Sequence, residues 1–377
     1  MIRQHALKTS RPRISLFVIA VLLLTNSVAA QDTAGVEKKA IWYDTIVING
    51  FTSASFSYNT NVPDSRKNQM RVFDTDDNSF KIDVIELALQ KPATNPGDVG
   101  FCFHLTAGSS VPKVARSSGL DIGDLDFHQM YVRYIAKVGR GLTIDFGKFV
   151  TPLGYELIEG YDGYNDNVTR SFLFGYAIPF THTGVRVGYP MSDAITATVM
   201  IVNGWDNAID NNRSKSVGGQ LMIVPVTGMT LCTNYIFGPE LNENNSNNRS
   251  VADVSASYAF NERFTLGLNA DYGAEQRTAP NGKTAKWNGV AAYFRLNATT
   301  RFSMTLRAEH FEDHDGGRTG FAQRLHEFTL TPEFRPTEGL VLRGDIRLDT
   351  SSGNVFEKRG GFSDKQLTFS ANMIFIY

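Results

Sequence analysis

The chain contains little cysteine, little net charge and almost no long apolar runs. Only two cysteines occur in 377 residues, which excludes a scaffold held together by many disulfides. Basic residues number 37 and acidic residues 38, so the basic excess typical of nucleic-acid-binding proteins is missing. Glycine and proline, at 33 and 13, are too few for collagen or a low-complexity chain. After the N-terminus, no apolar run approaches the ~18 residues of a membrane-spanning helix.

The first 30 residues have the order of a secretory signal peptide. Basic side chains between Arg3 and Arg13, with no acidic one among them, precede an apolar core at 15–24 and small residues at 27–30. An uncleaved membrane anchor is the alternative, but an apolar core of about ten residues is too short to span a bilayer. We therefore expect a signal peptide at 1–30, a short periplasmic segment at 31–44 and the folded protein at 45–377.

The rest of the chain alternates between apolar and polar residues, as strands do when their two faces meet different environments. The C-terminus shows this best, because residues 366–377 place large apolar side chains at every second position and end on Tyr377. Most such segments run about 10–13 residues, the length of a tilted strand that crosses a bilayer. An interruption at Val84-Ile85 predicts a β-bulge. Sixteen segments are expected, starting near Thr45, Phe80, Val99, Phe127, Leu142, Thr183, Ile195, Ser216, Met229, Val251, Phe264, Trp287, Phe302, Leu325, Leu340 and Gln366.

The connections between these segments alternate between short turns and long polar loops. Outer-membrane barrels have short periplasmic turns and longer extracellular loops, and a closed sheet leaves no unpaired edge in lipid. The predicted fold class is therefore all-β: a transmembrane antiparallel β-barrel of about 16 strands, within a range of about 14–18. A soluble sandwich or propeller is disfavoured, because the sheet is too large for one core and no repeated blade motif occurs.

In such a barrel the polar face of each strand lines the lumen. This face combines charges of both signs, which predicts a water-filled pore for passive diffusion of small hydrophilic solutes and ions, with weak overall ion selectivity. The residues predicted to line the pore are Arg133, Asp145, Arg186, Asp253, Asp271, Arg295, Arg307, Glu309, Glu327, Arg343, Asp345 and Arg347, with Asp349 next to them.

Residues 147–181 form the longest connection and combine charges, aromatic residues and glycine. Long loops are usually functional or disordered, and the aromatic content favours an ordered one. We expect this third long loop to fold into the lumen and narrow it. The alternative is an external loop that packs on the barrel rim or on a neighbouring subunit. The candidate constriction charges are Lys148, Glu156, Glu159, Asp162 and Arg170.

Three stretches carry a family resemblance: Gly147-Lys148-Phe149 with the residues at 151–156, Arg170-Ser171, and the residues at 202–206. With these the chain resembles the putative beta-barrel porin-2, OmpL-like family, over most of the length after the signal peptide. The resemblance implies an outer-membrane porin of a Gram-negative bacterium. It implies no particular solute and supplies no catalytic residue.

Other chemistry is weakly indicated. A cluster of acidic and histidine residues at 310–315 contains metal-ligand types but no ligand spacing, and no Gly-x-Ser-x-Gly elbow occurs. We therefore predict no enzyme activity, no catalytic or metal site and no cofactor. A non-conducting adhesin or structural barrel that acts through its extracellular loops, such as 241–250, is the alternative function.

The predicted location, after signal-peptide cleavage, is the cell outer membrane. Expected partners are outer-membrane lipid and lipopolysaccharide, small hydrophilic solutes, and the periplasmic chaperones and barrel-assembly machinery. Nucleic acid is not expected, and a homo-oligomer is left open.

Overall fold

A computed structural model describes residues 42–111 and 125–377. The signal peptide predicted at 1–30, and most of the periplasmic segment predicted at 31–44, lie outside the described residues. The described part begins with a short 3₁₀ helix at Trp42–Thr45 and continues with strands. Within it, no helix is long and apolar enough to cross a membrane.

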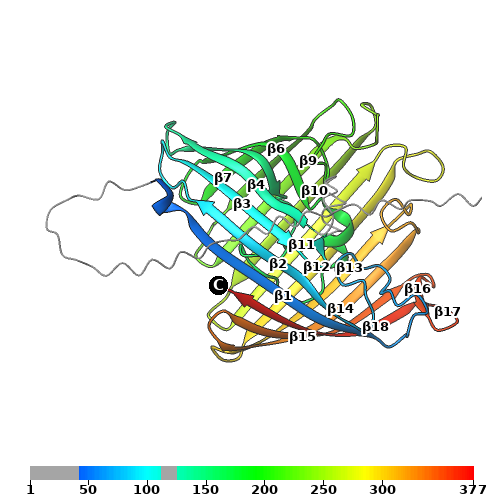
Figure 1. The fold of residues 1–377 in the computed structure, drawn as a ribbon. Coiled ribbons are helices and arrows are strands. Elements are labelled where there is room, and N and C mark those ends of the chain that lie inside the picture. Colours follow the sequence, from blue (N-terminus) through cyan, green and yellow to red (C-terminus); the bar gives the residue numbers. More distant parts are fainter. Residues whose placement is uncertain (1–41, 112–124) are drawn as a thin grey trace, which may run out of the picture. The chain divides into compact units, whose positions relative to one another are not determined.

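Sixteen of the described strands form one closed antiparallel barrel. Each strand pairs with its neighbours along the chain, and the last strand returns to pair with the first, as Phe56 with Ala371 (Figure 1). The barrel strands are β1 (Val47–Asn59), β2 (Ser79–Lys91), β3 (Val99–Ala107), β4 (Leu125–Ala136), β5 (Leu142–Val150), β6 (Thr181–Pro190), β7 (Ile195–Val202), β8 (Ser216–Ile223), β9 (Met229–Pro239), β10 (Asn248–Ala259), β11 (Phe264–Glu275), β12 (Ala285–Asn297), β13 (Phe302–Asp313), β14 (Gln323–Thr337), β15 (Leu340–Ser351) and β18 (Lys365–Ile376).

The fold class and the strand number predicted from alternation are confirmed. The largest difference between a predicted and an observed strand start is at β10, which was expected to begin near Val251 and begins at Asn248. Short turns alternate with long connections along the chain, also as expected. The last long connection also contains a small hairpin, of β16 (Phe356–Lys358) and β17 (Gly361–Ser363), that was not predicted.

Two β-bulges interrupt the ladder between neighbouring strands on one side of the barrel. The first bulge is in β2. Ser53 of β1 pairs with Val84 and the next residue, Ala54, pairs with Ile82, so Asp83 of β2 has no partner in β1. The bulge predicted next to Val84 is thereby confirmed. The second bulge, in β4, leaves His128 unpaired with β3 and was not predicted. Bulges re-aim side chains and occur near functional sites.

The outer surface of the barrel carries exposed apolar side chains such as Val199, Ile201 and Phe328, as a lipid-facing surface requires. The inner surface carries most of the charges, but it is not polar throughout. Trp287, Phe311 and other wall residues point inward and form a buried apolar cluster with the connection between β5 and β6. The lumen is therefore not lined by polar side chains throughout, because part of the wall packs against that connection.

Gly147 in β5 has a backbone that an alanine cannot adopt without strain. Its φ is +142°, and an added Cβ would lie 2.2 Å from the carbonyl oxygen of Met130. We expect Gly147→Ala to lower the free energy of unfolding by roughly 2 kcal/mol or more. Gly344→Ala is the matched control, because its Cβ would meet only a carbonyl oxygen of Ser370 at 3.5 Å. Thermal unfolding of the two variants in detergent checks this, and equal midpoints would contradict it.

Candidate functional site: a loop across the lumen

The connection between β5 and β6, residues 151–180, lies inside the barrel, and we call it the lumen loop. It contacts strands from several sides of the wall. The carbonyl of Pro152 accepts a hydrogen bond from Gln220 of β8 at 3.0 Å. The amide N–H of Tyr161 donates to Glu86 of β2 at 2.6 Å, and Asn167 donates to Thr331 of β14 at 2.7 Å. A segment that reaches β2, β8 and β14 crosses the lumen, which agrees with the infolding hypothesis and not with an external loop.

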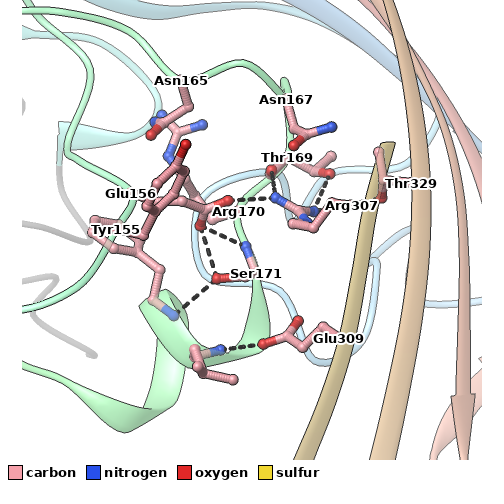
Figure 2. Close-up of polar contacts among 12 residues, drawn as sticks. Tyr155, Glu156, Asn165, Asn167, Thr169, Arg170, Ser171, Arg307, Glu309 and Thr329 are labelled. Atoms are coloured by element: carbon pink, nitrogen blue, oxygen red, sulfur yellow. Dashed lines mark hydrogen bonds and ion pairs between the residues drawn. The ribbon is translucent and has the colours of Figure 1, made fainter. Parts of the chain in front are cut away.

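Arg307 of β13 is the main anchor of the lumen loop. Figure 2 shows its guanidinium pointing from the strand toward Glu156 and Thr169 of the loop. It pairs with Glu156 at 2.5 Å and with Glu327 of β14 at 2.9 Å, and it donates to the carbonyl of Thr169 at 2.6 Å. The Arg307 side chain has no solvent exposure. Two carboxylates thus share one buried arginine, and one of the two belongs to the loop.

A second anchor joins the loop to β15. Arg343 lies 3.0 Å from Glu159, which is also 3.3 Å from Arg170 within the loop. Arg347 donates to the carbonyl of Arg170 at 2.5 Å, and its guanidinium carbon lies 5.0 Å from the centre of the Phe172 ring. Buried arginines of the wall therefore bind both side chains and backbone of the loop.

Wall carboxylates bind the backbone N–H groups of the same loop. Asp345 accepts hydrogen bonds from Val168 and Thr169 at 3.1 and 2.8 Å. Glu309 accepts from Phe172 and Leu173 at 2.7 and 2.6 Å, where a single helical turn, η2 (Leu173–Ala177), begins (Figure 2). Charge-assisted hydrogen bonds of this kind are among the stronger ones in proteins. They fix the path of the loop as well as its position.

Aromatic packing supports the start of the loop. The ring of Tyr155 stacks on Tyr293 of β12 with centroids 4.3 Å apart. It lies over Gly267 of β11, where an added Cβ would be 2.3 Å from the ring. The absence of a side chain at Gly267 therefore makes room for the loop.

Most of the residues predicted to line the pore face inward but are buried rather than in contact with open water. The expectation that all of them border water is wrong for the nine that are at most 5 % exposed, because the lumen loop and neighbouring wall residues cover them: Asp145, Asp253, Asp271, Arg307, Glu309, Glu327, Arg343, Asp345 and Arg347. Asp349, beside them, is fully buried as well. The partly exposed side chains are Arg133, Arg186 and Arg295, at 32, 20 and 13 %.

The constriction candidates also divide into groups. Lys148 lies on β5 rather than in the loop, where its ammonium is 2.8 Å from Asp126, so its assignment to the loop was wrong. Glu156, Glu159 and Arg170 are in the loop but buried in its anchors. Asp162 is the most exposed of the five, with a side chain that is 52 % accessible.

The space left around the lumen loop is uneven. Toward the short turns, a cavity of about 730 Å³ is lined by Arg295, Glu333 and Arg335 among others. A second cavity, of about 360 Å³, borders Arg133 and Asp162 near the turn at 92–98. A third, separate cavity, where the loop faces β1–β4, has a volume of only about 50 Å³. The smallest of these three cavities therefore lies between the loop and that part of the wall.

The sequence profile of one family, described as putative beta-barrel porin-2, OmpL-like, matches residues 45–377. The chain belongs to this family. It is an outer-membrane porin, a β-barrel that allows passive diffusion.

Solved porin structures share the fold of this porin at low sequence identity. The outer membrane channel DcaP of Acinetobacter baumannii has a TM-score of 0.59 at 10% identity, covering 88% of this chain and 97% of its own. An anion-selective porin from Comamonas acidovorans has a TM-score of 0.59 at 10% sequence identity, and the match covers 88% of this chain and 99% of that porin. Salmonella typhi OmpF has a TM-score of 0.60 at 11% sequence identity, and the match covers 89% of this chain and 99% of OmpF. No curated protein matches the sequence.

Asp206, after β7, holds the end of the lumen loop. Its Oδ1 accepts hydrogen bonds from the N–H groups of Phe180 and Thr181 at 2.6 and 2.9 Å. Burial raises the pKa of Asp206 to about 7, although the two N–H groups act in the opposite direction. Nearby Arg318 is also buried, and burial lowers its pKa to about 10. The clamp at this end of the loop is therefore sensitive to pH near neutrality.

We expect Arg307→Ala to lower the free energy of unfolding by about 3–5 kcal/mol, because it leaves Glu156 and Glu327 buried without their shared cation. The released loop should also make single-channel currents larger and noisier. Arg140→Ala removes an exposed ion pair with Asp193 and should cost at most about 1 kcal/mol. Thermal unfolding measures the stability of the two variants, and planar-bilayer recordings measure their conductance. If Arg307→Ala behaved like Arg140→Ala, Arg307 would not be an anchor of the loop.

The pKa of Asp206 predicts a pH-dependent stability. The folded protein keeps this carboxyl protonated up to about pH 7, whereas the unfolded chain ionises it near 3.8. The stabilisation that the protonated Asp206 gives to the folded state is therefore fully present below pH 3.8. It is lost as the pH rises through about 7, which lowers the free energy of unfolding by up to roughly 4 kcal/mol. Asp206→Asn cannot ionise, so its stability relative to the parent should rise over this interval. Unfolding midpoints measured between the two pH values check this, and a constant difference would refute it.

Proposed function

We propose that solutes pass along the space between the lumen loop and the β1–β4 wall, and that the loop sets the size limit of the pore. The small volume of the cavity between the loop and β1–β4, about 50 Å³, carries this proposal. A cavity of this size holds only a few water molecules, since each needs roughly 10–15 Å³ of such space. The pore therefore passes small hydrophilic solutes and ions and excludes larger ones.

The exposed charges beside this path fit a role in lining it. Arg133 and Arg186 both pair with Asp145, at 2.7 and 2.8 Å, and so carry one net positive charge. Asp162 borders the same cavity as Arg133 and offsets that charge. Around the larger cavity, Arg295 is paired with Glu333 at 2.8 Å. Mixed charges of this kind support weak ion selectivity.

The remaining roles follow from the family and the fold. The porin acts without catalysis or a cofactor in its conducting role, and it reaches the outer membrane after cleavage near residue 30. Its apolar outer surface meets membrane lipid and lipopolysaccharide, and its insertion uses periplasmic chaperones and the barrel-assembly machinery. A structure of Vibrio cholerae OmpT that shares the fold, with a TM-score of 0.54 at 10% identity, is described as a trimer form. A homo-oligomer fits this chain as well.

Deletion of residues 155–167 tests the size limit. The deletion removes the part of the loop that contains Glu156 and Glu159, so we expect larger conductance steps and entry of larger neutral polymers. Single-channel recording of the refolded protein in planar bilayers measures both. Deletion of 242–246, in the connection between β9 and β10, is the control and should leave conductance unchanged.

Two results would overturn the proposal. Equal conductance before and after removal of 155–167 would show that the loop does not limit the pore. A folded parent protein that never conducts would favour the alternative function, a barrel that acts through its extracellular loops.

A further inference from the structure

Three neighbouring strands place a carboxylate and two imidazoles together inside the barrel. Glu86 comes from β2, His104 from β3 and His128 from β4. One ligand-type atom from each lies within 4.8 Å of those of the other two. All three residues are buried, with exposed fractions of 0, 0 and 3 %. The members of this group lie far apart along the chain, so no spacing in the sequence marks them as one site.

The bulge in β4 brings His128 into the group. His104 pairs with Gln129, and Leu105 pairs with Phe127, so His128 is the extra residue. As a result His128 and Gln129, although adjacent, are both buried at 3 % exposure, which regular alternation would not allow at the lipid boundary. A local departure from strand geometry thus aims an imidazole at Glu86.

The distances suit a shared cation. His104 Nδ1 and His128 Nδ1 lie 2.9 and 3.4 Å from the same oxygen, Oε1 of Glu86. Ligand atoms about 2.0–2.1 Å from a tetrahedral metal lie about 3.3 Å from one another. His104 Nδ1 meets no hydrogen-bond geometry although it lies so close to Glu86, and a metal would replace any proton that it shares with this carboxylate. One carboxylate oxygen and two imidazole nitrogens therefore converge at metal-ligand spacing.

Neighbouring groups hold these ligands in place. Nε2 of His104 lies 2.6 Å from the side-chain amide nitrogen of Gln90, and this contact fixes the ring. For Nδ1 to bind a metal, Nε2–H must donate to the amide oxygen of Gln90, so the amide is turned over in the metal-bound form. The second oxygen of Glu86 accepts the Tyr161 N–H at 2.6 Å. Metal-binding histidines and carboxylates usually have such supporting hydrogen bonds.

We propose that Glu86, His104 and His128 bind one divalent transition-metal cation, of which Zn²⁺ fits best. Two imidazoles and a carboxylate are a common ligand set for this ion. The fourth position is open to Asp162 of the lumen loop, whose carboxylate lies 3.9 Å from His104 Nδ1, or to water.

Cavities lie next to the site on two sides. Asp162 and Gln90 border the cavity of about 360 Å³ toward the short turns, and His128 borders the small cavity beside the loop. Because Glu86 also holds Tyr161, the cation fastens the lumen loop to β2–β4. Metal binding then stabilises the loop where the pore is narrowest.

Calorimetric titration of the chelator-treated, folded full-length barrel with Zn²⁺ tests this site. We expect one equivalent to bind in the micromolar range or tighter. His128→Ala and Glu86→Gln should each weaken binding by at least about 100-fold, and Gln90→Ala by about 10-fold. Heat-modifiable gel migration shows that each variant has folded.

His310 and His326 provide the matched control. These two imidazoles lie 3.1 Å apart on neighbouring strands, but in an exposed position. The double variant His310→Ala/His326→Ala should bind Zn²⁺ as the parent does. The inference is overturned if the parent does not bind at micromolar zinc, or if only the control variant loses binding. It is equally overturned if His128→Ala, Glu86→Gln and the parent bind alike.

Discussion

A charge that is removed from water must find a partner, and this constraint organises the interior of the barrel. Arg307, Arg343 and Arg347 point inward from β13 and β15, and their side chains have no solvent exposure. Isolated charges in such surroundings would cost several kcal/mol each. Glu156 and Glu159 of the lumen loop supply part of the balancing charge. The loop is therefore part of the electrostatic interior of the barrel rather than an addition to it.

The same constraint links the fold to its function. A loop that completes buried ion pairs cannot leave the lumen without exposing or isolating them, so it holds a fixed position during diffusion. The apolar cluster around Trp287 and Phe311 adds a non-polar contact surface at the helical turn of the loop. In the proposed function, permeation then follows the space along β1–β4. The Glu86–His104–His128 group lies on that wall, which is why a cation there would act on the pore.

Local patterns determined how much of this could be predicted from the sequence. Alternation has a period of two residues, so it located all sixteen barrel strands and the bulge beside Val84. The contacts of the lumen loop are not local, since Glu156 meets a residue 151 positions away. Alternation identified Arg307 and Asp345 as inward-facing but carried no information on what would cover them. Phe311 points inward and is buried, but its residue type alone does not distinguish it from an aromatic side chain that faces lipid. Lys148 was misplaced because the residues at 147–150 continue β5.

The most direct test of the central claim is a disulfide between the lumen loop and the opposite wall. In a chain with Cys102 and Cys232 replaced by serine, Asn167→Cys is combined with Thr331→Cys, since these side chains are in hydrogen-bond contact. The control combines Asn167→Cys with Leu330→Cys, which faces outward. Mass spectrometry of the folded, oxidised barrels should find the cross-link in the first pair and not in the second. No cross-link in the first pair, or equal cross-linking in both, would contradict a loop held across the lumen.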